Sequence, residues 1–311
     1  MISSRRSARR AWANRLVGAF AILFILAVLL PVRAQAQGGV KLFQRQLMAG
    51  RSPAVILIVG WQKDQESVNR LIDVVSQRAA ETFARLDWMN PASDVSRINA
   101  SAGTAAVRVS PDVAEAFKEA KKISSWTKGA FDITYAGSGS YKDIKAGKNS
   151  VELKKSGMQA RFDPLIEGYL AEYMIRLIYA AGMQNAMVKV GNVFRGTGSG
   201  VSGPWKIQVQ DDAGTYAHHA LNLVVSNAGI ATASASQYRG TPLIDPKSKR
   251  AITPLCKGTT IVMQNATEAQ GVAYAVFVLG PKKGYEMVTK LGNARGLIVD
   301  NNGKFIRTPG F

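Results

Sequence analysis

Cysteine and histidine, the side chains that most often act as nucleophiles or transition-metal ligands, are nearly absent from this chain. Cys256 is the only cysteine, which rules out an intrachain disulfide and a Cys-x-x-Cys metal site. The only histidines, His218 and His219, are adjacent and precede a strand-like run, in which neighbouring side chains point to opposite faces. They therefore cannot jointly bind one metal ion, and we predict that they lie at the surface or at a sheet edge.

The elements that must position any other reactive side chain are predicted from apolar periodicity, capping residues and turn residues. In the first half of the chain they are a strand over 54–61, a helix over 66–86, a turn to Asn99 capped by Ser93 or Asp94, a helix from Ser110-Pro111 to Gly129, and a loop or hairpin over 137–155.

The second half of the chain predicts three further helices and five strands. The helices are 164–181, closed by Gly182; 268–279, capped by Asn265 or Thr267 and closed by Gly280-Pro281; and 284–291. The strands are 186–190, 205–210, 220–225, 259–263 and 296–299. Long helices with mostly hairpin-connected strands indicate an α+β fold, a single module of mostly antiparallel sheet with packed helices.

The first 36 residues have the order of a secretory signal. Five arginines come first, an apolar run follows over 16–32, and Ala34-Gln35-Ala36 forms a small-x-small cleavage site. We therefore expect a signal peptide over 1–36, a globular module over 37–311, and a periplasmic or otherwise exported location. The alternative is an uncleaved N-terminal anchor, and we expect a membrane attachment only in that case.

The chain is strongly basic, with 40 basic and 21 acidic residues and a formal net charge of +19. Six of the arginines lie in residues 1–36, which leaves 34 basic against 21 acidic residues in the remainder. The lysines are scattered, and no stretch interleaves arginine with aromatic residues. This pattern argues against nucleic acid as a partner and favours adsorption to anionic lipid or attraction of a phosphate-bearing ligand.

Four stretches, taken in order and with their spacing, make the chain similar to the ApbE family over nearly all of residues 37–311. The resemblance implies an enzyme that uses magnesium to move FMN from FAD onto a threonine of a partner protein, with release of AMP. The stretches are Ser93-Asp94-Val95-Ser96-Arg97-Ile98-Asn99, Thr127-Lys128-Gly129-Ala130-Phe131-Asp132-Ile133-Thr134, Leu243-Ile244-Asp245-Pro246 and Ala273-Tyr274-Ala275-Val276-Phe277-Val278-Leu279-Gly280.

The resemblance also implies which residues contact the flavin nucleotide. Four of them have an alternative structural role: Asn99 as a turn former, Asp132 as a cap, Thr134 as a strand residue and Tyr169 as a core residue of a helix. The implied flavin-contacting residues are Asn99, Asp132, Thr134, Gly168, Tyr169 and Gly191.

The implied metal site departs from the family pattern. Gln270 stands where the family places a metal-binding Asp, and Tyr274 stands where it places a metal-site Thr. An amide carries no net charge and a tyrosine is far larger than a threonine, so we expect magnesium affinity to fall sharply. Glu268 lies two residues before Gln270, but positions two apart on a helix do not share a face.

Other family motifs also lack residues that the family pattern places in them. Over Arg161–Tyr169 only Gly168 and Tyr169 match the family's Asp-x-Gly-Gly-x-x-Lys-Gly-Tyr, and Glu167 reverses the charge of its lysine. Residues 188–193 keep one glycine, Gly191, and lack the expected acid. Pro242 replaces the His that precedes Ile-Asp-Pro, and Ala231–Ser234 lacks its glycine.

These features predict a divergent family member in which magnesium-dependent FMN transfer is impaired or lost while flavin-nucleotide binding is retained in part. FAD and Mg²⁺ are the expected cofactors if the family site works, and a flavin nucleotide and an envelope protein are the expected partners. One alternative is an active transferase with a rearranged metal site, in which Glu268, Asp245 or Asp132 supplies the carboxylate. Another is a non-catalytic envelope scaffold.

Overall fold

The computed structural model describes residues 39–209, 221–235 and 242–311. The signal-like segment 1–36 and His218-His219 lie outside the described residues, so the predictions about them remain predictions. Residues 36–311 form one compact unit. No helix among the described residues is long and apolar enough to cross a membrane.

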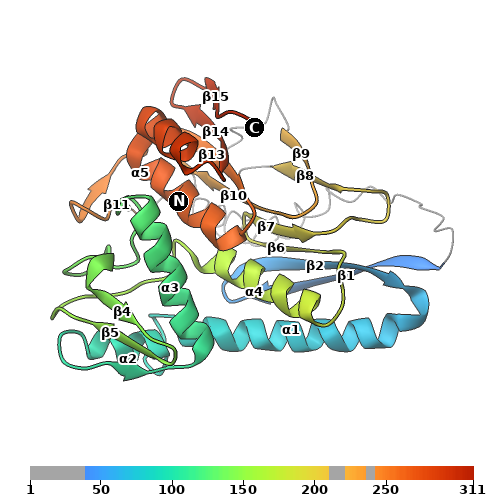
Figure 1. The fold of residues 1–311 in the computed structure, drawn as a ribbon, viewed down its shortest axis with the longest axis horizontal. Coiled ribbons are helices and arrows are strands. Elements are labelled where there is room, and N and C mark those ends of the chain that lie inside the picture. The colour runs from blue at the N-terminus through green and yellow to red at the C-terminus, as the bar shows by residue number, and fades with distance from the viewer. Residues whose placement is uncertain (1–38, 210–220, 236–241) are drawn as a thin grey trace, which may run out of the picture. The chain divides into compact units, whose positions relative to one another are not determined.

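The centre of this unit is an eight-stranded sheet in which every neighbouring pair is antiparallel, as the α+β prediction required (Figure 1). Its order is β1 (Val40–Ala49), β2 (Ser52–Trp61), β6 (Ala186–Val190), β7 (Val193–Thr197), β10 (Ala228–Ser234), β13 (Cys256–Met263), β14 (Arg295–Asp300) and β15 (Phe305–Arg307).

Three helices pack against one face of the sheet: α1 (Gln65–Leu86), α4 (Ile166–Ala180) and α5 (Ala266–Leu291). Their apolar positions recur at helical spacing, so each helix contributes one stripe to the main core. On the opposite face, β8 (Trp205–Val209) and β9 (Leu221–Val225) cover a smaller apolar cluster that includes Trp205, Ile207 and Leu297.

A second, three-stranded sheet lies at one end of the unit and has the order β3 (Val107–Arg108), β5 (Ser150–Leu153), β4 (Ile144–Ala146). It lies beside α2 (Asp94–Ala100) and α3 (Pro111–Trp126), as Figure 1 shows. The last elements are a short hairpin, β11 (Leu243–Asp245) and β12 (Arg250–Ile252).

The predicted caps are confirmed in part. Ser93 accepts a hydrogen bond from the Ser96 N–H at 3.0 Å and starts α2. Ser110 has the extended backbone of an N-cap and Pro111 begins α3, but the Ser110 hydroxyl makes no capping bond. The two helices predicted over 268–279 and 284–291 both form, as the two parts of α5, which meet at a kink at Gly280, where a φ of 75° and a ψ of 176° are not helical.

Candidate functional site

Asn99, at the end of α2, joins two segments that are distant in sequence. Its Nδ2 donates to the Ala160 carbonyl at 3.0 Å, and its Oδ1 accepts from the Ala160 N–H at 2.8 Å. The amide thus pairs with the backbone as a neighbouring strand would. Both ends of the amide are used to fix the loop that leads to α4.

Asp132 is buried and holds the loop that follows α3. Its Oδ1 accepts from the Thr134 N–H at 2.9 Å and the Thr134 hydroxyl at 2.8 Å, and its Oδ2 accepts from the Tyr141 N–H at 2.7 Å. The sequence placed Asp132 and Thr134 together as site residues, and the structure does bring them into contact. Their polar side-chain atoms bind each other and the local backbone.

The β11–β12 hairpin brings Asp245 towards the same loop. Burial alone would raise the pKa of Asp245, but hydrogen bonds from Lys247 and Ser248 outweigh burial and lower the pKa. Lys249, whose φ of 57° lies in the left-handed region, donates from Nζ to the Thr134 carbonyl at 2.7 Å. Burial lowers the pKa of this ammonium, and the Asp132 and Asp245 carboxylates offset only part of that effect.

Gln270 and Gly168 meet where α4 crosses α5. The Gly168 N–H donates to Gln270 Oε1 at 2.7 Å, and the Thr267 hydroxyl donates to the Gly168 carbonyl at 3.3 Å. A Cβ atom on Gly168 would lie 2.6 Å from the Ala266 carbonyl oxygen, so this position needs glycine for the helices to approach.

Tyr274, one turn after Gln270, is buried, and its hydroxyl donates to the Ile244 carbonyl at 2.9 Å. Its ring packs edge-on against Phe131, with the ring centroids 5.9 Å apart. The tyrosine therefore fills the space between α5, the β11 strand and the loop after α3.

Tyr169 lies in the core, away from these groups. Its hydroxyl donates to the Asp112 carbonyl at 2.6 Å, and its ring stacks on Tyr173. Burial raises the pKa of this phenol. Its contacts lie with α3 and α4.

Glu268 faces α3 and not the Gln270 side of α5. Its carboxylate forms an ion pair with Lys122 at 3.0 Å, and Lys122 also pairs with Glu119 at 2.6 Å. Gln270 instead contacts Gly168 of α4. The two side chains leave α5 on different faces, as their spacing predicted.

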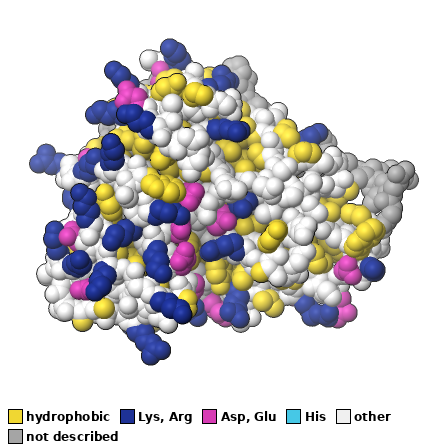
Figure 2. Space-filling model, in the orientation of Figure 1, with side chains coloured by type: hydrophobic (Ala, Val, Ile, Leu, Met, Phe, Trp, Pro, Cys, Tyr) yellow, Lys and Arg dark blue, Asp and Glu magenta, His cyan; other side chains and the backbone are white. Residues whose placement is uncertain are grey.

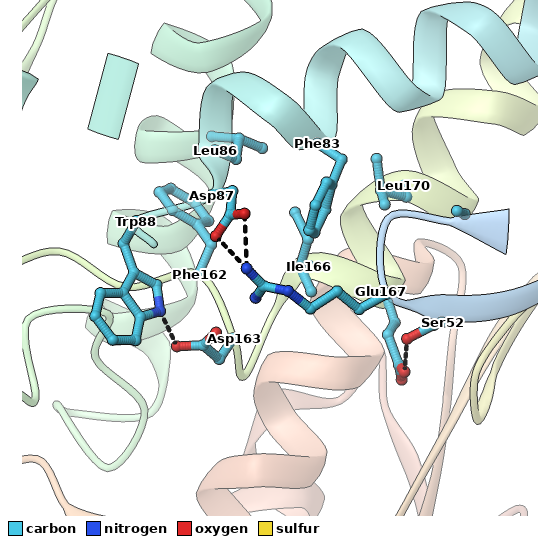
Figure 3. Close-up of a pocket in the computed structure, with 12 residues that line it drawn as sticks. Ser52, Phe83, Leu86, Asp87, Trp88, Phe162, Asp163, Ile166, Glu167 and Leu170 are labelled. Atoms are coloured by element: carbon cyan, nitrogen blue, oxygen red, sulfur yellow. Dashed lines mark hydrogen bonds and ion pairs between the residues drawn. The ribbon is translucent and has the colours of Figure 1, made fainter. Parts of the chain in front are cut away.

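A cavity of about 140 Å³, which the sequence did not reveal, opens where the ends of α1 and α4 meet the turn between β1 and β2. Its walls are largely apolar, including Phe83, Leu86, Ile166 and Leu170 (Figure 3). Three carboxylates and one guanidinium line it beside these walls: Asp87, which pairs with Arg51 at 2.7 Å; Asp163, which accepts from Trp88 Nε1 at 2.8 Å; and Glu167.

Glu167 is one of the polar side chains of this cavity and contacts two separate segments, at Ser52 and at Gly191-Asn192. It accepts from the Ser52 hydroxyl at 2.6 Å and the Asn192 N–H at 3.5 Å, and a Cβ on Gly191 would lie 2.0 Å from its Oε1. Burial raises the pKa of Glu167, against the opposing effects of Ser52, Asn192 and Lys189. Gly191, a predicted flavin contact, thus makes room for the Glu167 carboxylate.

The tertiary structure therefore divides the predicted site residues into separate groups. Gly168 contacts Gln270, and Asp132 and Thr134 lie beside Lys249 and the Asp245 hairpin, with Tyr274 bonded to that same hairpin. Gly191 borders the cavity through Glu167. Asn99 and Tyr169 instead bind backbone groups elsewhere. The one sequence signal that could have indicated the cavity is the pair of aromatic residues Phe83 and Trp88, which lie just before a polar loop.

The model of the ApbE family matches residues 55–138 and 137–298. Among curated proteins, the FAD:protein FMN transferase of Klebsiella pneumoniae is 29% identical over 143 residues, which cover 43% of this chain and 40% of that protein. The match thus spans about two fifths of that relative's length. The FAD:protein FMN transferase of Haemophilus influenzae is 23% identical over 265 residues, covering 72% of this chain and 76% of that protein.

Solved structures with the same fold include the apo flavinyl transferase ApbE of Pseudomonas stutzeri, with a TM-score of 0.76 and 19% identity over 87% of this chain and 95% of that one. The ApbE protein of Thermotoga maritima has a TM-score of 0.74 and 18% identity over 86% of this chain and 97% of that one. Family model, curated relatives and fold agree, and this chain belongs to the ApbE family.

Proposed function

We propose that this chain is a divergent ApbE-family protein that does not transfer FMN efficiently and retains at most a partial flavin-binding cleft. The relatives are named for transfer of FMN from FAD to protein. In that reaction a hydroxyl attacks a phosphorus flanked by negative oxygens, so a divalent cation must neutralise the pyrophosphate. The proposal depends on whether the residues here suit such a cation.

The observation that carries the proposal is that the polar atoms of Gln270 and Tyr274 are already hydrogen-bonded to the backbone. Mg²⁺ prefers carboxylate oxygens, and it holds few protein ligands beside its waters. Gln270 Oε1 accepts a backbone N–H at 2.7 Å, and the Tyr274 hydroxyl donates to a backbone carbonyl at 2.9 Å. Both groups are neutral and both already bind the chain itself, so this donor set does not fit a magnesium ion.

The three carboxylates that could replace the lost ligand already form ion pairs or hydrogen bonds within the chain. Glu268 is paired with Lys122, Asp132 accepts three hydrogen bonds, and Asp245 accepts bonds within its own turn. Lys249 moreover supplies a positive charge beside Asp132 and Asp245. An ammonium that already faces both carboxylates counts against the alternative of an active transferase with a rearranged metal site.

The cavity supports partial rather than full recognition of FAD. Pockets for drug-sized ligands measure roughly 300–1,000 Å³, whereas this one measures about 140 Å³. Its charged lining holds three carboxylates, Asp87, Asp163 and Glu167, and one guanidinium, Arg51, which is already paired with Asp87, so the excess of acids disfavours a pyrophosphate. A flavin ring or a smaller fragment suits the apolar walls better than the whole dinucleotide does.

The proposal is tested by incubating the protein with FAD, Mg²⁺ and an acceptor protein that a family transferase flavinylates, and by mass spectrometry of the acceptor. We expect no FMN adduct with this chain and complete modification with the active relative. Calorimetric titration of FAD with and without Mg²⁺ runs in parallel, with no dependence on the metal expected. Robust magnesium-dependent flavinylation would overturn the proposal.

A further inference from the structure

The region from residue 94 to 160, which contains α2, α3 and the three-stranded sheet, has an unusual distribution of charge. Every residue in it is described, and none of its acidic residues is exposed, whereas nine basic residues are. Figure 2 shows Lys and Arg side chains gathered over these elements. We call the nine the basic region: Arg97, Arg108, Lys118, Lys128, Lys142, Lys145, Lys148, Lys154 and Lys155.

The segment holds eleven basic and seven acidic residues, and all seven acidic residues are less exposed than the basic region. Asp143 pairs with Lys155 at 3.1 Å, Glu152 lies 3.7 Å from Lys145, and Asp94 pairs with Arg97. The other six side chains of the basic region form no ion pair with any described residue. The segment therefore carries a net positive charge, and its exposed charged residues are all basic.

The basic region also lacks the features of a protein or nucleic-acid interface. Protein interfaces are anchored by aromatic or large apolar side chains, yet every exposed large hydrophobic residue of the described chain lies outside residues 94–160. Single-stranded nucleic acid is held by exposed aromatic rings along a groove, and no exposed aromatic ring lies in this region. A broad basic surface without exposed apolar or aromatic side chains is better suited to bind a broad, negatively charged partner surface.

We propose that the basic region docks onto the surface of an anionic lipid bilayer. Lysine and arginine side chains within a Debye length of anionic headgroups are attracted strongly and without specific geometry. Because six of the nine are not already paired within the described chain, they can bind headgroups without breaking an ion pair. The inference is independent of FMN transfer, since none of these side chains contacts the candidate site.

The test is co-sedimentation with vesicles, using residues 36–311 so that the apolar segment 16–32 cannot insert. These residues form a compact unit, and 95% of the Pseudomonas stutzeri structure aligns with 87% of this chain, so this part can be expected to fold alone. We expect binding to phosphatidylglycerol vesicles that weakens as salt rises, and little binding to phosphatidylcholine vesicles.

The decisive variant replaces Lys142, Lys148 and Lys154 by Gln, three exposed residues around the β4–β5 hairpin without ion pairs in the described chain. Its matched control replaces Lys282, Lys283 and Lys290 of α5 by Gln. This control removes the same number of positive charges from a surface that also carries an exposed acidic residue, Glu286. We expect the first variant to lose affinity for phosphatidylglycerol by at least about tenfold and the control to lose far less.

Three outcomes would overturn the proposal. Equal losses in the two triple variants would mean that only net charge matters. Equal binding to phosphatidylcholine would mean that apolar contacts dominate. Tighter binding to a short DNA duplex than to phosphatidylglycerol at the same salt concentration would assign the surface to nucleic acid.

Discussion

Gln270 and Tyr274 are neutral side chains whose polar atoms bind the backbone of neighbouring elements. They stabilise the junctions of α5 with α4 and with β11. Under the proposal made above, such a site keeps its packing and loses its affinity for a cation.

Restoring the two family residues should therefore restore metal binding. In the double variant Gln270→Asp and Tyr274→Thr, the carboxylate adds a hard, charged oxygen and removal of the ring opens space. We expect affinity for Mg²⁺ to rise at least about tenfold in a calorimetric titration. The matched control, Gln270→Asn with Tyr274→Thr, opens the same space without the charge. Equal affinities in the two variants would contradict the assignment.

Glu167 makes stability depend on pH. Burial raises its pKa above the ordinary value of 4.5, so the folded state holds the proton more tightly than the unfolded state. The free energy of unfolding should fall as pH rises from 4.5 through the raised pKa. Glu167→Gln should remove this dependence. The free energy of unfolding of the variant, measured by urea denaturation, should therefore rise relative to that of the parent between pH 4 and pH 8. A difference in the free energy of unfolding that stays constant across that range would contradict a raised pKa of Glu167.

Glu172 and Arg195 form a buried ion pair at 2.8 Å, with 8% and 12% of their side chains exposed, and Glu172 also accepts from the Ala266 N–H at 2.9 Å. Glu172→Gln leaves Arg195 buried without its counter-charge, which should cost about 3 kcal/mol of unfolding free energy. Asp73→Asn, which removes the exposed pair with Arg45, should cost less than about 1 kcal/mol. Similar losses by urea denaturation would argue that the Arg195 charge is solvated.

At the scale of elements, α5 holds the site positions in place, and its start depends on Asn265. The Asn265 Oδ1 accepts from the Thr267 N–H at 2.8 Å and the Glu268 N–H at 3.2 Å. These bonds satisfy two of the N–H groups that a helix leaves unpaired at its first turn. The cap therefore fixes the register of Glu268 and Gln270 relative to α3 and α4.

Asn265→Ala should lower the free energy of unfolding by roughly 0.5–2 kcal/mol, because both bonds are lost. Asn265→Asp keeps the acceptor and places a negative charge at the positive end of the helix, so it should be nearly as stable as the parent. Thermal unfolding of both variants checks this. If Asn265→Asp lost as much as Asn265→Ala, the side chain would have another role.

At the scale of the whole molecule, we propose that residues 1–36 direct export and are then removed. When the full chain is expressed in a bacterium with two membranes, we expect it in the periplasmic fraction with Gln37 as its first residue. Leu23→Arg with Leu26→Arg interrupts the apolar run and should leave an uncleaved chain inside the cell. Mass spectrometry of the N-terminus measures both results. Export with Met1 retained would favour the uncleaved anchor.

The sequence by itself determined the long helices, the fold class and the family. Amphipathic stripes over 66–86, 111–129 and 268–279 are local signals, because one helix face must be apolar to meet the sheet. It missed β1, β7, β10 and β15, since edge strands and strands rich in small residues lack a clear alternation. It also identified Gln270 and Tyr274 as departures, because the motif around them aligns without a gap.

Only the tertiary structure decided what each of these side chains does. Spacing indicated that Glu268 and Gln270 face different ways, but the packing of three helices selected Lys122 for one and Gly168 for the other. The cavity combines Ser52, Trp88 and Glu167, which come from three separate segments of the chain. Burial likewise separated exposed bases from half-buried acids over residues 94–160. Such contacts join residues far apart in the chain, and local periodicity carries no information about which elements meet.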